Sequence, residues 1–173
     1  MPIPPDKKHN LEILISTTKK NNLDFIENIF FENHRHNFPI IIVNQVGKIK
    51  NSNNKNIKII NTETKGLSKS RNMAIKNSSK KFCLLADDDI IYKNGFYKTI
   101  EQSFEENLDA DIITFMMVDK NGKHFKKYSN NIKHNYKSIR EVNSVVIAFK
   151  RESIIKNNIQ FDTLFGLGAT FET

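Results

Sequence analysis

Three consecutive aspartates, Asp87, Asp88 and Asp89, directly follow a short apolar run. Adjacent carboxylates repel one another, and a divalent cation between them relieves that repulsion. Mg²⁺ and Mn²⁺ are commonly held by one or two carboxylates, with water and phosphate oxygens completing the shell. Alternate side chains of an extended segment point to the same side, so Asp87 and Asp89 are the expected metal ligands. A solvated acidic turn that caps the following helix explains the triplet equally well.

A second polar group lies in the stretch KGLSKSRN, residues 65–72, which precedes an apolar helical segment. Gly66 allows a close approach, Ser68 offers a hydroxyl and Arg71 a cation, which suits an anion at a helix N-terminus. Alternatively, Gly66 makes a turn, Ser68 caps the helix and Arg71 is a surface charge. Together with the aspartates, this stretch predicts a pocket for a phosphate and its metal.

The elements that must position these residues alternate between strands and helices. Short apolar runs predict strands over residues 11–16, 38–45, 57–61, 81–86, 110–118 and 143–150. Helical periodicity is seen around residues 23–30, from residue 66 to 78 and over residues 94–106, and residues 119–123 read as a hairpin turn. This alternation predicts an α/β fold whose sheet is parallel and doubly wound over the first two thirds of the chain.

Ligands of such sheets bind at the carboxyl ends of the strands. Polar residues stand at three of these ends, and we expect them to converge on one crevice. They are Ser16, Thr17 and Thr18, then Asn44 and Gln45, then the three aspartates.

Length and composition indicate one folded domain. The chain has 173 residues, of which 38% are apolar and 27% charged, enough for a core and too apolar for disorder. We expect residues 1–10 to be a loose tail and residues 11–173 to form the domain. No apolar run is long enough to cross a bilayer and the first residues do not resemble a secretory signal, so we expect a cytoplasmic protein. A single cysteine, Cys83, excludes a disulfide framework and a cysteine-built zinc site.

The net charge of +8 first suggests nucleic-acid binding. Of the 27 cationic residues, however, only four are Arg, the residue that bidentate phosphate and base recognition favours. A solvated basic surface is therefore the preferred interpretation, with no nucleic-acid partner, and weak attraction to an anionic membrane face fits the same charge.

In chain order, the segments IST, GLSKSRN, FCLLADDD and FGLGATF resemble the nucleotide-sugar-binding core of the family 2 glycosyltransferases, which have the GT-A fold. The resemblance covers residues 11–173, and its most specific part is the pairing of GLSKSRN with the strand that ends in DDD. It implies that Asp87 and Asp89 form the DxD motif that binds Mn²⁺ or Mg²⁺. The donor-binding residues that we expect from the resemblance and the strand ends together are Ser16, Thr17, Asn44, Gly66, Ser68, Arg71, Asp87 and Asp88.

The resemblance also implies the reaction. The family moves a sugar from a nucleotide-sugar donor to a glycan or lipid-linked acceptor, commonly in polysaccharide biosynthesis at the inner face of the plasma membrane. For this chain we expect a UDP-sugar as the donor. A metal-dependent direct displacement with inversion is expected. The family's catalytic base follows the FGLG segment in a short acidic motif, and Glu172 does not occupy its position. We therefore assign no catalytic residue and expect a C-terminally truncated core whose catalytic base lies beyond Thr173. Asn44 also replaces the family's usual base-binding aspartate.

Two other classes stay open from the residues alone. A nucleotidyltransferase also binds Mg²⁺ through aspartates of an α/β sheet, but it normally carries a Gly-rich loop after the first strand, where this chain reads ISTTKKNN. A non-catalytic basic binding module is the third possibility.

Overall fold

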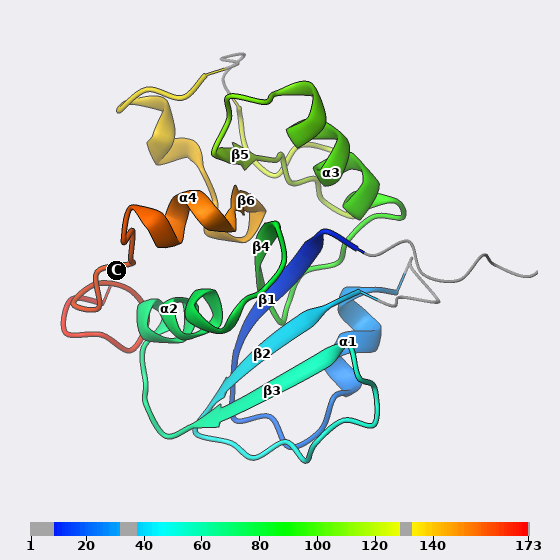
Figure 1. Ribbon diagram of the computed structural model, residues 1–173, viewed down its shortest axis with the longest axis vertical. Helices are drawn as coiled ribbons and strands as arrows, with labels where there is room; N and C mark the ends of the chain where they lie inside the picture. Colours follow the sequence, from blue (N-terminus) through cyan, green and yellow to red (C-terminus); the bar gives the residue numbers. More distant parts are fainter. Residues whose placement is uncertain (1–8, 32–37, 129–132, 173) are drawn as a thin grey trace, which may run out of the picture.

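The computed structural model describes residues 9–31, 38–128 and 133–172, which form a six-stranded sheet with helices on both faces (Figure 1). The strands are β1 (Leu11–Thr18), β2 (Ile40–Gln45), β3 (Ile57–Thr62), β4 (Phe82–Asp87), β5 (Ile112–Thr114) and β6 (Ile147–Lys150). The helices are α1 (Asp24–Ile29), α2 (Leu67–Asn77), α3 (Phe96–Glu106) and α4 (Arg151–Lys156), with 3-10 turns η1 (Ser138–Glu141) and η2 (Ser144–Val146). Of the expected N-terminal tail, residues 1–8 lie outside the described part.

The sheet has the strand order β3-β2-β1-β4-β6-β5. Strands β3, β2, β1 and β4 are mutually parallel, whereas β6 runs antiparallel to both of its neighbours. The predicted α/β fold with a mostly parallel sheet is thereby confirmed, and the parallel part lies where the sequence predicts it. All four carboxyl ends of the parallel strands therefore open on the same edge of the sheet.

The apolar sequence of the central strand β1 accounts for its place in the middle of the sheet. Every residue from Leu11 to Thr17 is buried, as expected for a parallel strand that is covered on both faces. Ile13 and Ile15 pack on one side with Phe25 and Ile29 of α1, and the intervening Leu14 packs on the other. The apolar run thus specifies a strand between two helical layers.

The helices fall into two layers (Figure 1). Ala74 and Ile75 of α2 share one core cluster with Ile154 of α4. Ile100 and Phe104 of α3 pack in another cluster, which joins the α1 side through the rings of Phe96 and Tyr97. In the described part of the chain, none of the helices combines the length and the apolar character that a bilayer crossing requires.

The last third differs from the sequence-based expectation. The strand predicted over residues 110–118 is reduced to the three residues of β5, because β6, the strand beside it in the described sheet, is itself four residues long. The predicted strand over residues 143–150 is shortened because residues 144–146 turn into η2 before β6 begins. The hairpin turn is confirmed, since the N–H of Asp119 donates to the carbonyl of Lys123 at 2.7 Å and Val118 pairs with His124. Helix α4 was not predicted.

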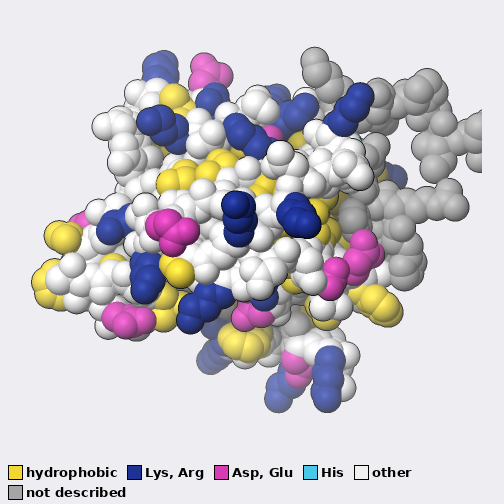
Figure 2. All heavy atoms as spheres, turned by 90° about the horizontal axis from the view of Figure 1, so that it is seen from below, with side chains coloured by type: hydrophobic (Ala, Val, Ile, Leu, Met, Phe, Trp, Pro, Cys, Tyr) yellow, Lys and Arg dark blue, Asp and Glu magenta, His cyan; other side chains and the backbone are white. Residues whose placement is uncertain are grey.

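One face of the surface, shown in Figure 2, carries Lys and Arg side chains that are spread out rather than gathered. Acidic and apolar side chains lie between them, so this face presents no continuous basic groove. That distribution is typical of a solvated basic surface.

Cys83 gives a first prediction. Its side chain is fully buried in β4, and burial raises the pKa of its thiol to about 12. The thiolate, which is the reactive form, is therefore almost absent at neutral pH. We expect a thiol reagent such as Ellman's reagent to label the native protein no faster than it unfolds, and to label it at once in denaturant. Rapid labelling of the native protein would show that β4 opens locally.

Candidate active site

The ends of β1 and β4 bring the first predicted site residues together. Ser16 and Asp87 are register partners in the two strands. One residue further along the chain from each of them, the Thr17 hydroxyl donates a hydrogen bond at 2.7 Å to Oδ2 of Asp88, the first residue after β4. The predicted convergence of strand ends is thus a direct contact between side chains 71 residues apart in the chain.

Of the three aspartates, Asp88 has the closest side-chain partners. Lys20 Nζ is 2.7 Å from its Oδ2, the same oxygen that accepts from Thr17. Burial by itself acts to raise the pKa of Asp88, but the hydrogen bonds from Lys20 and Thr17 and the Lys20 charge outweigh it and hold that pKa below its ordinary value. Asp88 is therefore ionised, and it ties the segment after β1 to the segment after β4.

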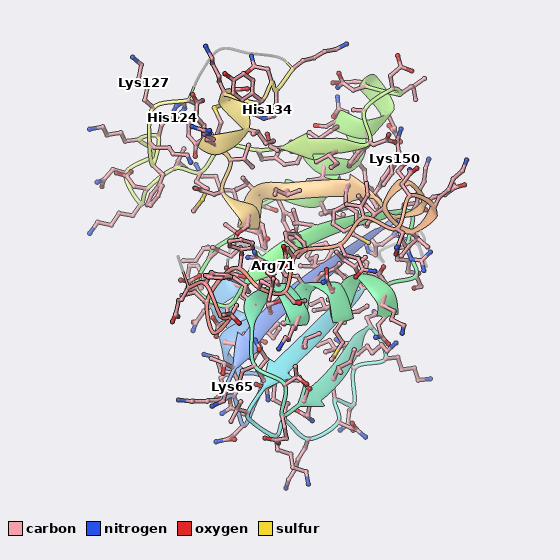
Figure 3. The ribbon with its side chains drawn as sticks, turned by 90° about the vertical axis from the view of Figure 1, so that its left-hand side faces the viewer. Lys65, Arg71, His124, Lys127, His134 and Lys150 are labelled. Atoms are coloured by element: carbon pink, nitrogen blue, oxygen red, sulfur yellow. The ribbon has the colours of Figure 1, made fainter. Side chains whose placement is uncertain are left out.

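Asp87 faces a buried arginine. Nη2 of Arg71 lies 3.3 and 3.4 Å from the two carboxylate oxygens of Asp87, and it donates to Ser144 Oγ at 2.8 Å. The guanidinium also stacks over the Phe161 ring at 5.6 Å. Only 7% of the Arg71 side chain is exposed, and its Nε has no hydrogen-bond partner among the described residues. Figure 3 shows Arg71 at the centre of the molecule, where α2 meets segments from the last third of the chain.

At Asp87, burial and the two neighbouring aspartates together outweigh the charge of Arg71. Burial raises the pKa of Asp87, the Arg71 charge and hydrogen bond lower it, and the neighbouring Asp89 and Asp88 raise it, with the net result above the ordinary value. A second positive charge near Asp87 is therefore favourable, because Arg71 alone does not offset burial and the two like charges.

The carboxylate of Asp89 is available to bind a ligand. It is exposed, and no hydrogen bond or ion pair joins it to another residue in the described part of the chain. No group of three or more His, Cys, Asp or Glu that could hold a metal occurs among the described residues. Two carboxylates nevertheless fit a hard cation that takes its remaining ligands from water and a bound phosphate. The oxygen-only donor set and the unbalanced charge at Asp87 fit Mg²⁺ or Mn²⁺.

Asn44 is fully buried, and its amide is used within the protein. Its Oδ1 accepts from the Lys20 N–H at 3.1 Å, and its Nδ2 donates to the Lys20 carbonyl at 2.9 Å and to Asn61 Oδ1 at 3.1 Å. Asn44 thus holds the backbone of the residue whose side chain pairs with Asp88. The contact between Asn44 and a nucleobase that the resemblance implies stays a prediction.

The start of α2 is covered by the FGLG segment. The N–H of Leu67 donates to the Leu167 carbonyl at 3.0 Å, and the Ser68 hydroxyl donates to the Phe165 carbonyl at 2.8 Å. Gly66 has a φ of 121°, which L side chains rarely adopt, so a glycine is needed at this helix start. These two donors already have carbonyl partners, and phosphate binding by Gly66 and Ser68 stays a prediction.

Ser16 is also engaged inside the protein. Its hydroxyl accepts from Ser70 Oγ at 2.9 Å, and both side chains are buried between β1 and α2. Its position fits a role in fixing α2 against the sheet.

Three residues of this site were missed in the sequence. Lys20 lies in the loop after β1. The rule that ligand-binding residues stand at strand ends, which identifies Thr17, would have included Lys20 if three more residues had been considered. Ser144 and Phe161 carry no local signal, because they reach Arg71 only through the folding of distant segments.

Comparison with known proteins gives the following matches. A family model described as Glycosyl transferase family 2 matches residues 8–168. S. aureus TarS 1-349 is 17% identical with a TM-score of 0.63, over 88% of this chain and 50% of that one. Its complex with UDP (16% identity, TM-score 0.62) and its complex with UDP-GlcNAc (19%, 0.62) match over 88% of this chain and 50% and 48% of theirs. The chain spans about half the length of these structures, whose likeness shows a shared fold. A search of curated proteins found no match.

Proposed function

Because the chain belongs to glycosyl transferase family 2, we propose that it forms the nucleotide-sugar-binding core of a glycosyltransferase. The enzyme moves a sugar from a nucleotide-sugar donor to a glycan or lipid-linked acceptor, with inversion at the anomeric carbon. The observation that carries the proposal is the state of the three aspartates. Asp88 is fixed by Lys20 and Thr17, Asp87 is backed by Arg71, and Asp89 has no partner in the described part of the chain.

Asp87 and Asp89 would hold a divalent cation, Mn²⁺ or Mg²⁺. When bound, that cation acts as a Lewis acid for the diphosphate of the donor. Arg71 holds Asp87 through both of its carboxylate oxygens, and the Asp87 side chain stays 29% exposed, which leaves it accessible to a cation. Asp88 holds the loops after β1 and β4 together, which preorganises the edge on which the nucleotide lies.

A UDP-sugar is the proposed donor. Support comes from the shared fold of TarS, which was crystallised with UDP and with UDP-GlcNAc. We propose Thr17 and Asn44 for the base and ribose, and Arg71, Gly66 and Ser68 near the diphosphate. Contact of a ligand with Asn44 or Ser68 requires a local rearrangement, because both side chains are hydrogen-bonded within the protein.

The acceptor hydroxyl would attack the anomeric carbon from the face opposite the nucleotide. In an inverting displacement, a carboxylate removes the proton of that hydroxyl as the bond to the diphosphate breaks. No residue is assigned as this base. Where the acceptor is lipid-linked, the enzyme works at the inner face of a membrane.

The test is thermal stabilisation of the purified protein by UDP- and GDP-sugars, with and without Mn²⁺. A ligand at 100 times its dissociation constant stabilises a protein by about 2.7 kcal/mol, which raises Tm by roughly 5–10 °C for a domain of this size. We expect a UDP-sugar to give such a shift only with the metal. Stabilisation by nucleoside triphosphates alone would favour nucleotidyl transfer, and a response only to polyanions would favour a binding module.

A further inference from the structure

Most of the net charge of the chain lies in one connection. Residues 115–146, between β5 and β6, contain six Lys and one Arg against Asp119 and Glu141, a net charge of +5 out of +8 for the whole chain. The other 141 residues share the remaining +3. The charged residues all lie in the described parts, residues 115–128 and 133–146, and we call these two parts the basic connection. The basic character is therefore local and is not a uniform property of the surface.

Six of the seven cations of the basic connection are exposed, and none of the seven forms an ion pair with another described residue. The two salt bridges among the described residues, Lys20 with Asp88 and Arg71 with Asp87, both lie at the strand ends and include none of them. An exposed cation without an acidic partner is free to meet an external anion. The exposed cations are Lys120, Lys123, Lys127, Lys133, Lys137 and Arg140. Figure 3 shows Lys127 extending away from the body of the protein.

Large apolar side chains are interleaved with these charges. Phe125 is 63% exposed and Tyr136 is 73% exposed, and Met116 and Ile139 are also largely exposed. Exposed aromatic and aliphatic side chains next to lysines match the chemistry of a membrane interface, where rings lie at headgroup level and lysines reach anionic headgroups.

Side-chain contacts hold the basic connection together and join it to the sheet. Within the segment, Lys126 Nζ donates to Asn143 Oδ1 at 2.9 Å, and the N–H of Met117 donates to the Tyr128 hydroxyl at 2.9 Å. His134 Nε2 lies 2.8 Å from the hydroxyl of Thr114 in β5, within hydrogen-bond distance. The charges and rings are therefore presented by an ordered surface.

The basic connection leaves the sheet at the edge that carries the candidate active site. Strand β5 is antiparallel to β6 and β6 is antiparallel to β4, so β5 ends at the same edge as β4. The segment returns through Ser144, whose hydroxyl accepts from Arg71 at 2.8 Å. A surface that binds the basic connection would therefore lie beside the aspartates.

We propose that the basic connection docks on an anionic lipid bilayer. Lysine predominance and exposed apolar side chains favour a lipid surface over a nucleic acid, which is recognised mainly by arginine and by basic grooves. The bilayer adds a partner to the proposed function, and it would bring a lipid-linked acceptor to the edge of the sheet that holds Asp87 and Asp89.

The test is flotation with vesicles of phosphatidylglycerol and phosphatidylcholine, and with vesicles of phosphatidylcholine alone. We expect binding to the anionic vesicles only, reduced about a hundredfold by Lys120→Gln, Lys123→Gln and Lys127→Gln together, because each lysine near such a surface is worth about fivefold. The matched control replaces Lys48, Lys50 and Lys55, three exposed lysines beside the β2–β3 edge, by Gln and should bind nearly as the parent does.

A second pair of variants tests the apolar contribution. Phe125→Ser should weaken binding about tenfold, whereas Leu108→Ser, at an exposed residue beyond α3, should not. Equal binding to neutral vesicles, equal loss in the lysine control, no vesicle binding, or binding to RNA without vesicle binding would each overturn the proposal. All variants should keep their nucleotide-sugar stabilisation, so failure here is distinguishable from failure of the proposed function.

Discussion

Asp89→Ala is expected to abolish the Mn²⁺-dependent part of the stabilisation by a UDP-sugar. Asp89 is the exposed carboxylate of the triplet and makes no hydrogen bond or ion pair within the described part of the chain. Its removal takes away one of two proposed ligands and leaves Asp87, which is already shared with Arg71. The metal-dependent rise in Tm, roughly 5–10 °C in the parent, should fall to near zero. Differential scanning fluorimetry with and without Mn²⁺ measures both values.

Asp109→Ala is the matched control. Asp109 is another exposed aspartate, but it precedes β5 and so lies at the opposite edge of the sheet. Without ligand, both variants should unfold within about 0.5 kcal/mol of the parent, as surface substitutions usually do. A full metal-dependent shift in Asp89→Ala would remove Asp89 from the site, and an equal loss in Asp109→Ala would show that the effect does not come from metal coordination.

The parallel half of the fold could be predicted because its strands are buried on both faces. A run such as LEILIS has no polar side that would suit a surface position, so it identifies β1 directly. The positions of Thr17 and the aspartates then follow from the rule that ligands bind at the carboxyl ends of parallel strands.

The last third of the fold could not be predicted, because it depends on contacts between distant segments that sequence patterns do not reveal. Strand β5 is short because β6 is short, and β6 is short because η2 turns the chain toward Arg71. The buried position of Arg71 was not predicted, since an arginine on a helix usually reaches solvent. Its partners, Ser144 and Phe161, lie 73 and 90 residues further along the chain.

The three aspartates show the same limit on a smaller scale. Their spacing indicates that Asp87 and Asp89 share a side, but it does not say that Asp88 is paired with Lys20 and Thr17 while Asp89 has no such partner. Only the fold assigns a different role to each of three identical neighbours. The triplet does not cap a helix, because α3 begins only at Phe96, with Gly95 before it. A metal role for Asp87 and Asp89 stays a prediction.

Arg71→Met should destabilise the protein by about 3 kcal/mol at neutral pH, because it leaves the largely buried Asp87 without its cationic partner. Burial already raises the pKa of Asp87, and loss of the opposing Arg71 charge raises it further. A carboxyl whose pKa is higher in the folded than in the unfolded chain contributes stability that is fully present below the unfolded pKa, near 4, and is lost as pH rises through the folded pKa. The difference in unfolding free energy between parent and variant should therefore grow from pH 4.5 to pH 7.5, as urea denaturation can measure.

Arg140→Met, at an exposed arginine in the basic connection, is the control and should cost less than about 0.5 kcal/mol at both pH values. Arg71→Lys separates charge from geometry, because an ammonium cannot span Asp87 and Ser144 as the guanidinium does. We expect Arg71→Lys to recover part of the stability and to retain most of the pH dependence of the parent. If Arg71→Met were as stable as Arg140→Met, Asp87 would not need a buried cation, and Arg71 would not be the residue that holds its carboxylate in place.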